Sequence, residues 1–334
     1  MRIGISSLMI QRGKTGVASY LFSLLQGFQK AATSHLFFLF VFEEDLPLFD
    51  SLKSDMSLIP VPERYRPPVR NILWHQSALP RLARHYSLDV LHVPSYRRLL
   101  WPKPCPLVAT IHDLAPFHVT GKYDWKRMFY GRVVVRRLAM RQDRVIAVSH
   151  NTAADLVRFF RLREAQIKVI HNGIDHRRFT PGSAPEAKAR VAHRLGLTSP
   201  FFLYVARLEH PGKNHLRLIQ AFEKFKNSCK SEFQLVFAGS DWHGAEAIHR
   251  AIQNSPHKKD IRSLGFVSLE ELPELYRAAE VFVYPSLFEG FGFPPLEAMA
   301  CGCPVISSTR GSLEEIVGTA ALTVDPENVD EMSY

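Results

Sequence analysis

The sequence predicts an α/β protein built from two doubly wound domains that face each other across a cleft. Three observations carry this prediction. Short apolar runs alternate with longer amphipathic runs through residues 1–170, the alternation stops over residues 172–185, and it resumes through residues 201–307. Such alternation is typical of a parallel sheet with helices on both faces. A chain of 334 residues is also long for one hydrophobic core and comfortable for two.

The first alternation supplies the strands and helices of one domain. Apolar runs rich in β-branched and aromatic residues predict strands at residues 2–7, 36–42, 90–93, 107–111, 145–148 and 168–170. Amphipathic runs predict helices at residues 17–30, 69–86, 123–141 and 151–160. In a sheet of this kind, the ligand site is expected at the carboxyl ends of the strands.

A linker and a second domain follow. Residues 172–185 contain Gly173, Pro181, Gly182 and Pro185 and show little periodicity. The expected domains are therefore residues 1–172 and residues 173–334. In the second domain, strands are predicted at residues 201–206, 233–238, 263–266, 281–284 and 305–307, and helices at residues 214–227, 245–254, 269–279 and 295–300.

One stretch of the second domain carries the strongest functional signal. The strand at residues 281–284 leads into a loop that contains Gly290 and Gly292. Pro294 and Pro295 then stand where the first turn of a helix needs no backbone donor. A loop that opens onto a helix N-terminus presents amide N–H groups and a partial positive charge to an anion, most often a phosphate.

Two carboxylates frame this loop. Glu289 lies just before it, and Glu297 lies in the first turns of the following helix. Carboxylates are poor phosphate ligands but good acceptors for the hydroxyls of a sugar. Phosphate donors between two hydroxyl acceptors suit a nucleotide sugar. The alternative is an ordinary surface glutamate and a second one that complements the helix dipole.

The segment from Glu289 to Glu297 reads Glu-Gly-Phe-Gly-Phe-Pro-Pro-Leu-Glu and resembles the E-x7-E motif of the retaining glycosyltransferases of family 4. The resemblance continues to Val305 and includes residues 148–152 and 169–175. It implies the GT-B fold, in which two Rossmann-like domains bind the acceptor and the nucleotide-sugar donor respectively. It also implies C-terminal crossover helices beyond residues 324–328, which are expected to be missing from this chain.

Arg207 and Lys213 are expected to supply positive charge to the same site. Arg207 follows the first strand of the second domain, and Lys213 precedes its first helix. A departing diphosphate needs cations that stay behind, and this spacing resembles the arginine and lysine that hold the diphosphate in the family. The alternative is a solvated pair at a helix start. No D-x-D pair occurs in the chain, which favours a metal-independent site without a cofactor.

The resemblance implies further contacts to the donor. Glu297 is expected to accept hydrogen bonds from the ribose hydroxyls, and Glu289 from a hydroxyl of the transferred sugar. Loop residues and their amides complete the binding of diphosphate and base, at Gly265, Phe266, Val267, Gly290, Phe291, Gly292 and Phe293.

Two features of the first domain are expected to face the ligand. His112 ends a central strand, where the family has a histidine that contacts the transferred sugar, although a lone histidine there is often structural. Gly13 and Gly16 follow the first strand and resemble the family's first glycine loop, which borders the acceptor and the sugar phosphate. The loop is not a P-loop, because Leu8 stands where that motif requires glycine.

The charge is distributed unevenly. Residues 1–180 contain 27 Lys and Arg against 13 Asp and Glu, whereas the remainder contains 15 against 19. Residues 122–141 mix cations with aromatic side chains, which would suit an anionic lipid surface or an acidic, lipid-linked acceptor. The alternative is the solvated face of an ordinary helix. Nucleic acid is disfavoured, because no recognised module accompanies the charge.

The N-terminus lacks the apolar core of a signal peptide, and the four cysteines show no paired framework. We therefore expect a cytoplasmic protein, either free or peripheral on the inner face of the membrane. The expected activity moves a hexose from a nucleotide sugar to a saccharide or lipid-linked acceptor in cell-surface polysaccharide synthesis. The run from Trp74 through His92 to His112 most resembles the mannosyltransferase branch of the family, which favours GDP-mannose over UDP-sugars. A nucleotide-sugar epimerase of the same fold and a non-catalytic nucleotide-sugar binding protein remain as alternatives.

Overall fold

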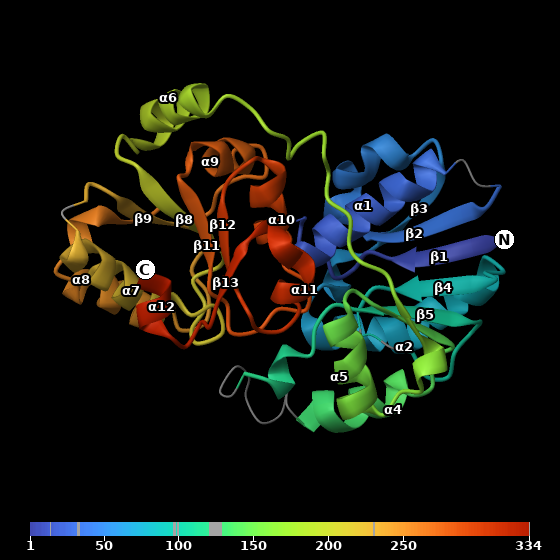
Figure 1. Cartoon of the computed structure of the whole chain (residues 1–334). Coiled ribbons are helices and arrows are strands. Elements are labelled where there is room, and N and C mark those ends of the chain that lie inside the picture. The colour runs from blue at the N-terminus through green and yellow to red at the C-terminus, as the bar shows by residue number, and fades with distance from the viewer. Residues whose placement is uncertain are drawn as a thin grey trace. The chain divides into compact units, whose positions relative to one another are not determined.

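The computed structural model describes residues 1–13, 15–31, 34–95, 98, 100–119, 129–229 and 231–333. The chain forms two compact units. Unit 1 comprises Met1–Leu114 and Asp124–Gly173, and unit 2 comprises Ala115–Tyr123 and Ile174–Tyr334 (Figure 1). Each unit contains a parallel sheet with helices packed against it, which confirms the predicted α/β class.

The sheet of unit 1 has the strand order β3-β2-β1-β4-β5-β6-β7. The chain order reverses between β1 and β4, which makes the carboxyl ends of these central strands the natural place for a ligand. The strands are β1 (Arg2–Ser6), β2 (Leu36–Phe42), β3 (Met56–Val61), β4 (Val90–Val93), β5 (Leu107–Ile111), β6 (Arg144–Ala147) and β7 (Ile167–Val169). The described helices are α1 (Gly16–Lys30), α2 (Pro68–His85), α4 (Arg136–Ala139) and α5 (His150–Phe160).

Local signals explain where these helices begin. Thr15 caps α1 by accepting a hydrogen bond from the backbone N–H of Ala18. Ser149 caps α5 in the same way through the N–H of Thr152. A π-helical turn at Tyr130–Val135 precedes α4. Both capped helices start directly after strands or short loops at the carboxyl edge of the sheet, so their first turns face the expected ligand side.

The sheet of unit 2 has the strand order β10-β9-β8-β11-β12-β13, and the chain order reverses between β8 and β11. Its strands are β8 (Phe201–Val205), β9 (Gln234–Ala238), β10 (Ile261–Ser263), β11 (Val281–Tyr284), β12 (Val305–Ser308) and β13 (Leu322–Val324). Its helices are α6 (Ala184–Leu195), α7 (His215–Ser228), α8 (Ala245–Asn254), α9 (Leu272–Ala278), α10 (Phe293–Ala300), α11 (Leu313–Val317) and α12 (Val329–Ser333).

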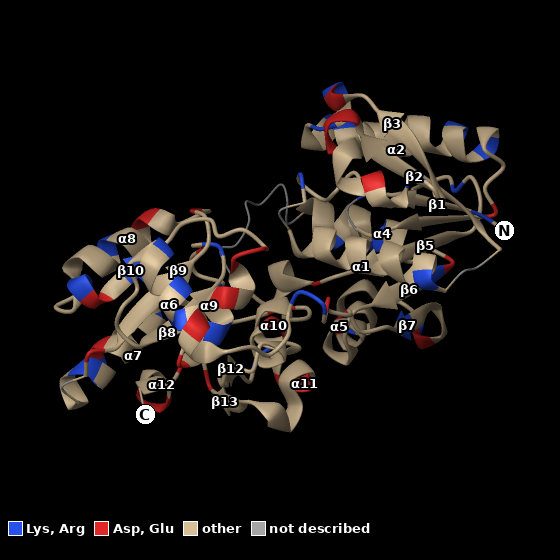
Figure 2. Cartoon of the chain, turned by 90° about the horizontal axis from the view of Figure 1, so that it is seen from above, with Lys and Arg blue, Asp and Glu red and all other residues tan. Residues whose placement is uncertain are grey.

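Large aromatic side chains fill the core of unit 2 beneath this reversal. Tyr204, Phe237, Tyr276 and Phe282 are each fully buried. Outside the core, α6 and α9 exchange surface ion pairs such as Arg190–Glu274, and Figure 2 shows both signs of charge on these helices. Exposed pairs of this kind contribute little to stability. The buried aromatic core therefore contributes more than these ion pairs to the stability of the unit that carries the loops after β8 and β11.

Several elements differ from the sequence prediction. The strand β3 was not predicted, because this edge strand contains Pro60, which weakens the sequence signal of a strand. The strand expected at residues 263–266 ends at Ser263, because Gly265 takes a positive φ of 68° that interrupts the extended chain. The helix α6 begins inside the expected linker: Ser183 caps it, and Pro185 occupies its first turn, where no donor is needed.

Other differences are smaller. The short elements α11, β13 and α12 were not predicted, and the remaining predicted boundaries agree within three residues where the structure describes them. Most of the helix expected at residues 123–141 falls on positions 123–128, outside the described residues, or on the π-helical turn and α4. Among the residues that the structure describes, no helix combines the length and the apolar composition needed to cross a bilayer.

Candidate functional site

Lys213 and Glu289 form an ion pair at the carboxyl edge of the unit 2 sheet. Lys213 lies on the loop after β8, and Glu289 lies on the loop after β11, the neighbouring strand. The Lys213 Nζ to Glu289 Oε1 distance is 2.5 Å, and the two side chains are only 16% and 17% exposed. The reversal of strand order thus brings together two residues that the sequence analysis assigned to different motifs.

Three donors converge on one oxygen of Glu289. Besides Lys213, the hydroxyl of Ser286 donates to Oε1 over 2.6 Å and that of Tyr284 over 3.1 Å. Burial lowers the pKa of Lys213, but Glu289, Tyr204 and Glu209 together outweigh burial and leave that pKa raised. Burial and the same carboxylate raise the pKa of Tyr284 well above its ordinary value. The lysine is therefore charged, the tyrosine is neutral, and the carboxylate is held in one orientation.

The two loops are tied together by their main chains. The N–H of Leu287 donates to the carbonyl of Gly212 over 3.0 Å. The side chain of Asn214 donates to the carbonyls of Pro285 and Pro326 at 3.0 and 2.7 Å. Asn214 can do this because it adopts a left-handed conformation, with φ 61°, immediately before α7. Asparagine tolerates this conformation better than most residues, so the start of α7 and the Glu289 loop form one rigid assembly.

Gly292 shapes the end of the glutamate loop. It precedes α10 with a φ of 113°, and a Cβ at this position would lie 2.6 Å from the side chain of Leu313. The hydroxyl of Ser312 lies 2.8 Å from the carbonyl of Phe291 and thereby fixes the preceding residue. Only glycine combines this φ with this close approach. The predicted glycine loop therefore has a structural reason that is independent of any ligand.

Glu297 is buried in α10. It is 8% exposed, and its Oε2 accepts a hydrogen bond of 2.9 Å from the hydroxyl of Tyr276. Burial raises the pKa of Glu297 to about 7, although Tyr276 and Arg178 oppose this shift. Glu289 and Glu297 both raise the pKa of Tyr284, so both carboxylates lie near its hydroxyl. Burial therefore favours the protonated form of the Glu297 carboxyl.

Arg207 extends the charged group beyond the lysine. Its guanidinium is 4.6 Å from the ring centroid of Trp242, and its Nη2 is 3.6 Å from Oε2 of Glu209. Glu209 is 5% exposed and also favours the charged form of Lys213. Arg207 itself is 46% exposed. One buried carboxylate therefore connects the half-exposed arginine with the buried lysine.

The expected base-binding segment lies at the end of β10, two strands away from β8. Gly265 accepts a hydrogen bond of 2.7 Å from the N–H of Gly239, and Phe266 is 57% exposed. A Cβ on Gly239 would lie 1.9 Å from the carbonyl oxygen of Ala206, so the loops after β8, β9 and β10 are pressed together at glycines. Val267 packs on the edge of the unit 2 core.

In unit 1, His112 ends β5 as expected. Burial lowers its pKa to about 4, against the opposing effect of Asp113, and it forms a hydrogen bond with the carbonyl of Pro94. Its Nε2 is buried and has no partner among the described residues. The tautomer that follows carries the proton on Nδ1, toward Pro94, so the ring is neutral and Nε2 is an acceptor.

A buried polar chain supports the His112 ring. The ring of Tyr20 contacts it edge-on, with centroids 4.9 Å apart. The hydroxyl of Tyr20 is 2.9 Å from Oγ1 of Thr110, which is 2.8 Å from Nε2 of His92. Burial raises the pKa of Tyr20 to about 12. Tyr20 lies on α1, so this helix fixes the orientation of the histidine.

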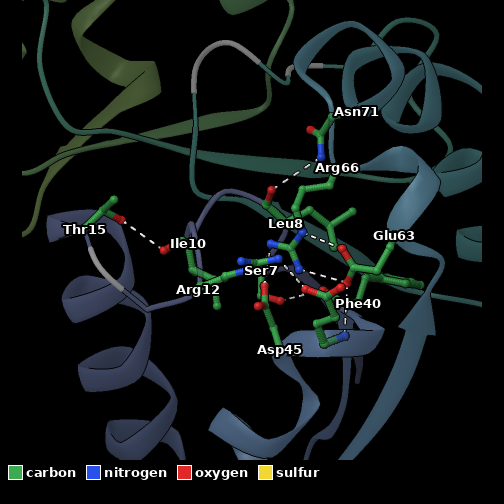
Figure 3. Close-up of polar contacts among 11 residues, drawn as sticks. Ser7, Leu8, Ile10, Arg12, Thr15, Phe40, Asp45, Glu63, Arg66 and Asn71 are labelled. Carbon is green, nitrogen blue, oxygen red and sulfur yellow. Dashed lines mark hydrogen bonds and ion pairs between the residues drawn. The ribbon is translucent and has the colours of Figure 1, made fainter. Parts of the chain in front are cut away.

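The first glycine loop links β1 to α1. Gly13 has a φ of 81° and donates its N–H to the carbonyl of Ile10, and the hydroxyl of Thr15 reaches the same carbonyl over 3.3 Å (Figure 3). Gly16 is the first residue of α1, and residue 14 lies outside the described residues. The side chain of Arg12 pairs with Glu44 from the segment after β2. The loop is thus held at both ends by local hydrogen bonds.

An ion cluster beside this loop was missed by the sequence analysis. Arg66 donates to Glu63 at 2.5 and 2.9 Å and to Asp45 at 3.2 Å (Figure 3). Its guanidinium also lies over the ring of Phe42. Hydrogen bonding from Arg66 lowers the pKa of Glu63. Asp45 is only 1% exposed, whereas the sequence shows just another acid in an acidic run. No spacing rule distinguishes it.

Other partners were also missed. Tyr276, Ser286 and Trp242 were not predicted as site residues, although each contacts one that was. The signal available for Trp242 was an indole within the polar run Ser-Asp-Trp-His-Gly directly after a strand. In the predicted basic segment, positions 122–128 lie outside the described residues, and Phe129 and Met140 are 58% and 45% exposed.

The whole fold matches solved structures of one class. It superimposes on Anabaena Alr3699/HepE in complex with UDP-glucose with a TM-score of 0.77 at 21% identity, covering 100% of this chain and 88% of that one. Sucrose-phosphate synthase from Thermosynechococcus elongatus gives 0.78 at 22%, with the same coverage. Two parallel Rossmann-like sheets with these neighbours define the GT-B fold.

Family models match nearly the full length. The model described as Glycosyltransferase Family 4 matches residues 14–178, and the one described as Glycosyl transferases group 1 matches residues 186–333. The chain belongs to glycosyltransferase family 4, as the resemblance of its E-x7-E segment predicted.

Curated relatives match about two thirds of the chain at 29–30% identity. O-antigen chain mannosyltransferase B of Escherichia coli is 30% identical over 68% of this chain and 59% of its own length. The MMP alpha-(1->4)-mannosyltransferase of Mycolicibacterium hassiacum is 30% identical over 68% and 55%. O-antigen chain mannosyltransferase RfbU of Salmonella typhimurium is 29% identical over 67% and 58%. The chain thus spans between 55% and 59% of the length of these three relatives.

Proposed function

We propose that this protein is a retaining glycosyltransferase that transfers a hexose from a nucleotide sugar to an acceptor hydroxyl. One observation carries the proposal. Lys213 and Glu289 are paired in a nearly buried position at the reversal of the unit 2 sheet, with Arg207 and Glu297 on the adjoining segments. This arrangement offers cations for a diphosphate and carboxylates for sugar hydroxyls within one set of loops.

The Lys213–Glu289 pair suggests how the donor enters. A diphosphate competes with Glu289 for the lysine, and a sugar hydroxyl replaces the lysine as a donor to the carboxylate. Each partner then exchanges one charged or polar contact for another, so neither group is left unpaired in a buried position. Tyr284 and Ser286 keep Glu289 in place during this exchange, because they donate to the same oxygen.

The other donor contacts follow from the positions of the residues. Arg207 and Lys213 stabilise the departing diphosphate, together with the amides near Phe291–Phe293, and this charge makes a metal ion unnecessary. Glu297 accepts hydrogen bonds from the ribose hydroxyls through the oxygen that Tyr276 does not occupy. The main chain of Gly265, Phe266 and Val267 recognises the edge of the base. Gly290 and Gly292 allow the loop to approach the phosphates.

Residues 1–172 are proposed as the acceptor side and residues 173–334 as the donor-binding domain. On the acceptor side, His112 offers an unprotonated Nε2 to a hydroxyl of the transferred sugar. Gly13 and Gly16 border the acceptor. Retention without an obvious protein nucleophile suggests attack from the face that the leaving group departs from, with the phosphate taking the acceptor's proton. This mechanism rests on the family.

GDP-mannose is the proposed donor, because the three relatives compared above are mannosyltransferases. UDP-sugars are the second candidate, and a saccharide or lipid-linked acceptor for cell-surface polysaccharide is proposed. We propose that the reaction takes place in the cytoplasm or on the inner face of the membrane. Contact with anionic lipid is proposed for the basic segment around Arg132, Arg136 and Arg137, and vesicles of anionic against neutral lipid test it by co-sedimentation.

A transfer assay tests the function. The protein is incubated with GDP-mannose or UDP-glucose, with and without a lipid-linked saccharide extract, and the released nucleoside diphosphate is measured. Release that depends on the extract supports transfer. Conversion of the donor without extract indicates an epimerase, and binding without release indicates a binding protein. Arg207→Ala should lose about 10²- to 10³-fold in turnover while the fold survives, because a charge on the leaving group is removed. A variant with near-wild-type turnover contradicts the proposal.

A further inference from the structure

The loops after β8 and β9 continue the pairing of their strands beyond the sheet. The N–H of Ala206 donates to the carbonyl of Ala238, that of Leu208 to Ser240, and that of Trp242 to Leu208, all between 3.0 and 3.1 Å. Gly244 closes the second loop with a φ of 80° and leaves room for His210. These bonds fix the backbone on which Arg207 and Trp242 stand.

Arg207 lies between the indole of Trp242 and the carboxylate of Glu209. Its guanidinium is 4.6 Å from the centroid of the Trp242 ring, and its Nη2 is 3.6 Å from the carboxylate of Glu209. Trp242 is 52% exposed, so about half of its side chain is not used in packing. Neither residue is required by the core of unit 2, because the fully buried aromatic side chains lie elsewhere.

We propose that Trp242 is a positioning residue for Arg207. The indole face restricts the guanidinium to one plane, and Glu209 sets its direction within that plane. A free arginine side chain loses rotamer entropy when it is fixed, so an arginine that is fixed in advance binds its anion more tightly. This inference rests on the proposed function, in which Arg207 contacts the diphosphate of the donor.

The size of the effect is bounded on both sides. The stacking of a cation on an aromatic ring at an exposed position corresponds to about a two- to fivefold change in affinity. Complete loss of the arginine is expected to cost about 10²- to 10³-fold in turnover. Trp242→Leu should therefore weaken diphosphate binding by at least about twofold and lose less turnover than Arg207→Ala. Trp242→Phe, which keeps an aromatic face, should retain most of the wild-type affinity and turnover.

The test compares wild type with Trp242→Phe, Trp242→Leu, Arg207→Ala and the double variant Trp242→Leu with Arg207→Ala. The Kd of GDP and of UDP is measured by calorimetry, and kcat and KM are measured with GDP-mannose or UDP-glucose. If Trp242 acts through Arg207, Trp242→Leu weakens diphosphate binding in wild type but changes nothing further in the Arg207→Ala background. A merely structural role of the indole would cost the same in both backgrounds and would overturn the proposal.

Fluorescence gives a second readout. Trp242 is the only tryptophan after residue 125, since the others are Trp74, Trp101 and Trp125. Binding of GDP or UDP at Arg207 should change the emission of wild type, and Trp242→Phe should lose most of this change. If wild type binds neither nucleotide and transfers no sugar, the proposed function fails. If wild type binds and transfers but Trp242→Leu equals it, only the role of Trp242 fails.

Discussion

Replacing Glu297 by glutamine should stabilise the protein at high pH and leave its stability nearly unchanged at low pH. Glu297 is 8% exposed, and burial raises its pKa to about 7 from an ordinary value of 4.5. Between these two values the folded protein holds a proton that the unfolded chain has lost. The free energy of unfolding of wild type therefore falls as the pH rises from about 4.5 to about 7.

The magnitude follows from the same two values. One pKa unit corresponds to about 1.4 kcal/mol, so the charged carboxyl costs the folded state about 3 kcal/mol at pH 8 and less than about 1 kcal/mol at pH 5. Glutamine keeps the shape and can still accept the hydrogen bond from Tyr276, but it does not ionise. Glu297→Gln should therefore gain about 2 kcal/mol over wild type between pH 5 and pH 8.

Urea unfolding at pH 5 and pH 8 measures this difference. Glu232→Gln is the matched control, because Glu232 is exposed and its replacement should leave the pH dependence unaltered. The same Glu297 variant should lose donor affinity, because an amide replaces the carboxylate proposed to accept from the ribose. If Glu297→Gln and wild type differ equally at both pH values, the carboxyl is not held protonated by burial and the reasoning fails.

Three further predictions concern the loops and the histidine. Lys213→Ala should destabilise the protein by about 2–4 kcal/mol in urea unfolding, because it leaves Glu289 buried beside two neutral donors. Adding Glu289→Ala to this variant should restore part of the stability but not the transfer activity. If Lys213→Ala is as stable as wild type, the two residues do not form a buried pair. Gly292→Ala should lower the free energy of unfolding by about 1–3 kcal/mol, as measured by thermal unfolding. Adding Leu313→Ala should remove the steric contact but not the backbone strain. If Gly292→Ala is as stable as wild type, the φ of 113° is not required. Because the pKa of His112 is lowered to about 4, its ring should stay neutral between pH 5.5 and 8, and wild type and His112→Asn should give pH–rate profiles of kcat with the same shape in this range. A step that is present in wild type and absent in His112→Asn would contradict a neutral ring.

The regular part of the fold follows from the sequence because its signals are local. The runs at residues 36–42, 201–206 and 281–284 are apolar and β-branched or aromatic, and they form strands within one residue of the predicted ends. The edge strand β3 contains Pro60 and half-buried positions, so its stability depends on pairing with β2 and is invisible to periodicity. The helix α6 was not predicted, and its first two residues were assigned to the linker because Pro185 suits both a linker and the first turn of a helix.

The candidate site is predictable in its members but not in its pairings. Glu289, Glu297, Arg207 and Lys213 could be identified from motif spacing and strand–loop–helix context. The pairing of Lys213 with Glu289 depends on β8 and β11 being neighbours in the sheet, which is a property of topology. The raised pKa of Glu297 depends on how deeply its carboxyl is buried. Neither quantity can be read from spacing.

Hydrogen exchange tests the central claim most directly. Backbone amide exchange is measured with and without saturating GDP-mannose or UDP-glucose, and peptides covering residues 207–214, 265–267 and 289–297 are compared with those of α6 and α12. We expect slower exchange in the first three segments on adding the donor that binds, and no change in α6 or α12. Protection elsewhere, or in only one of the three segments, would show that these residues do not bind a single nucleotide sugar together.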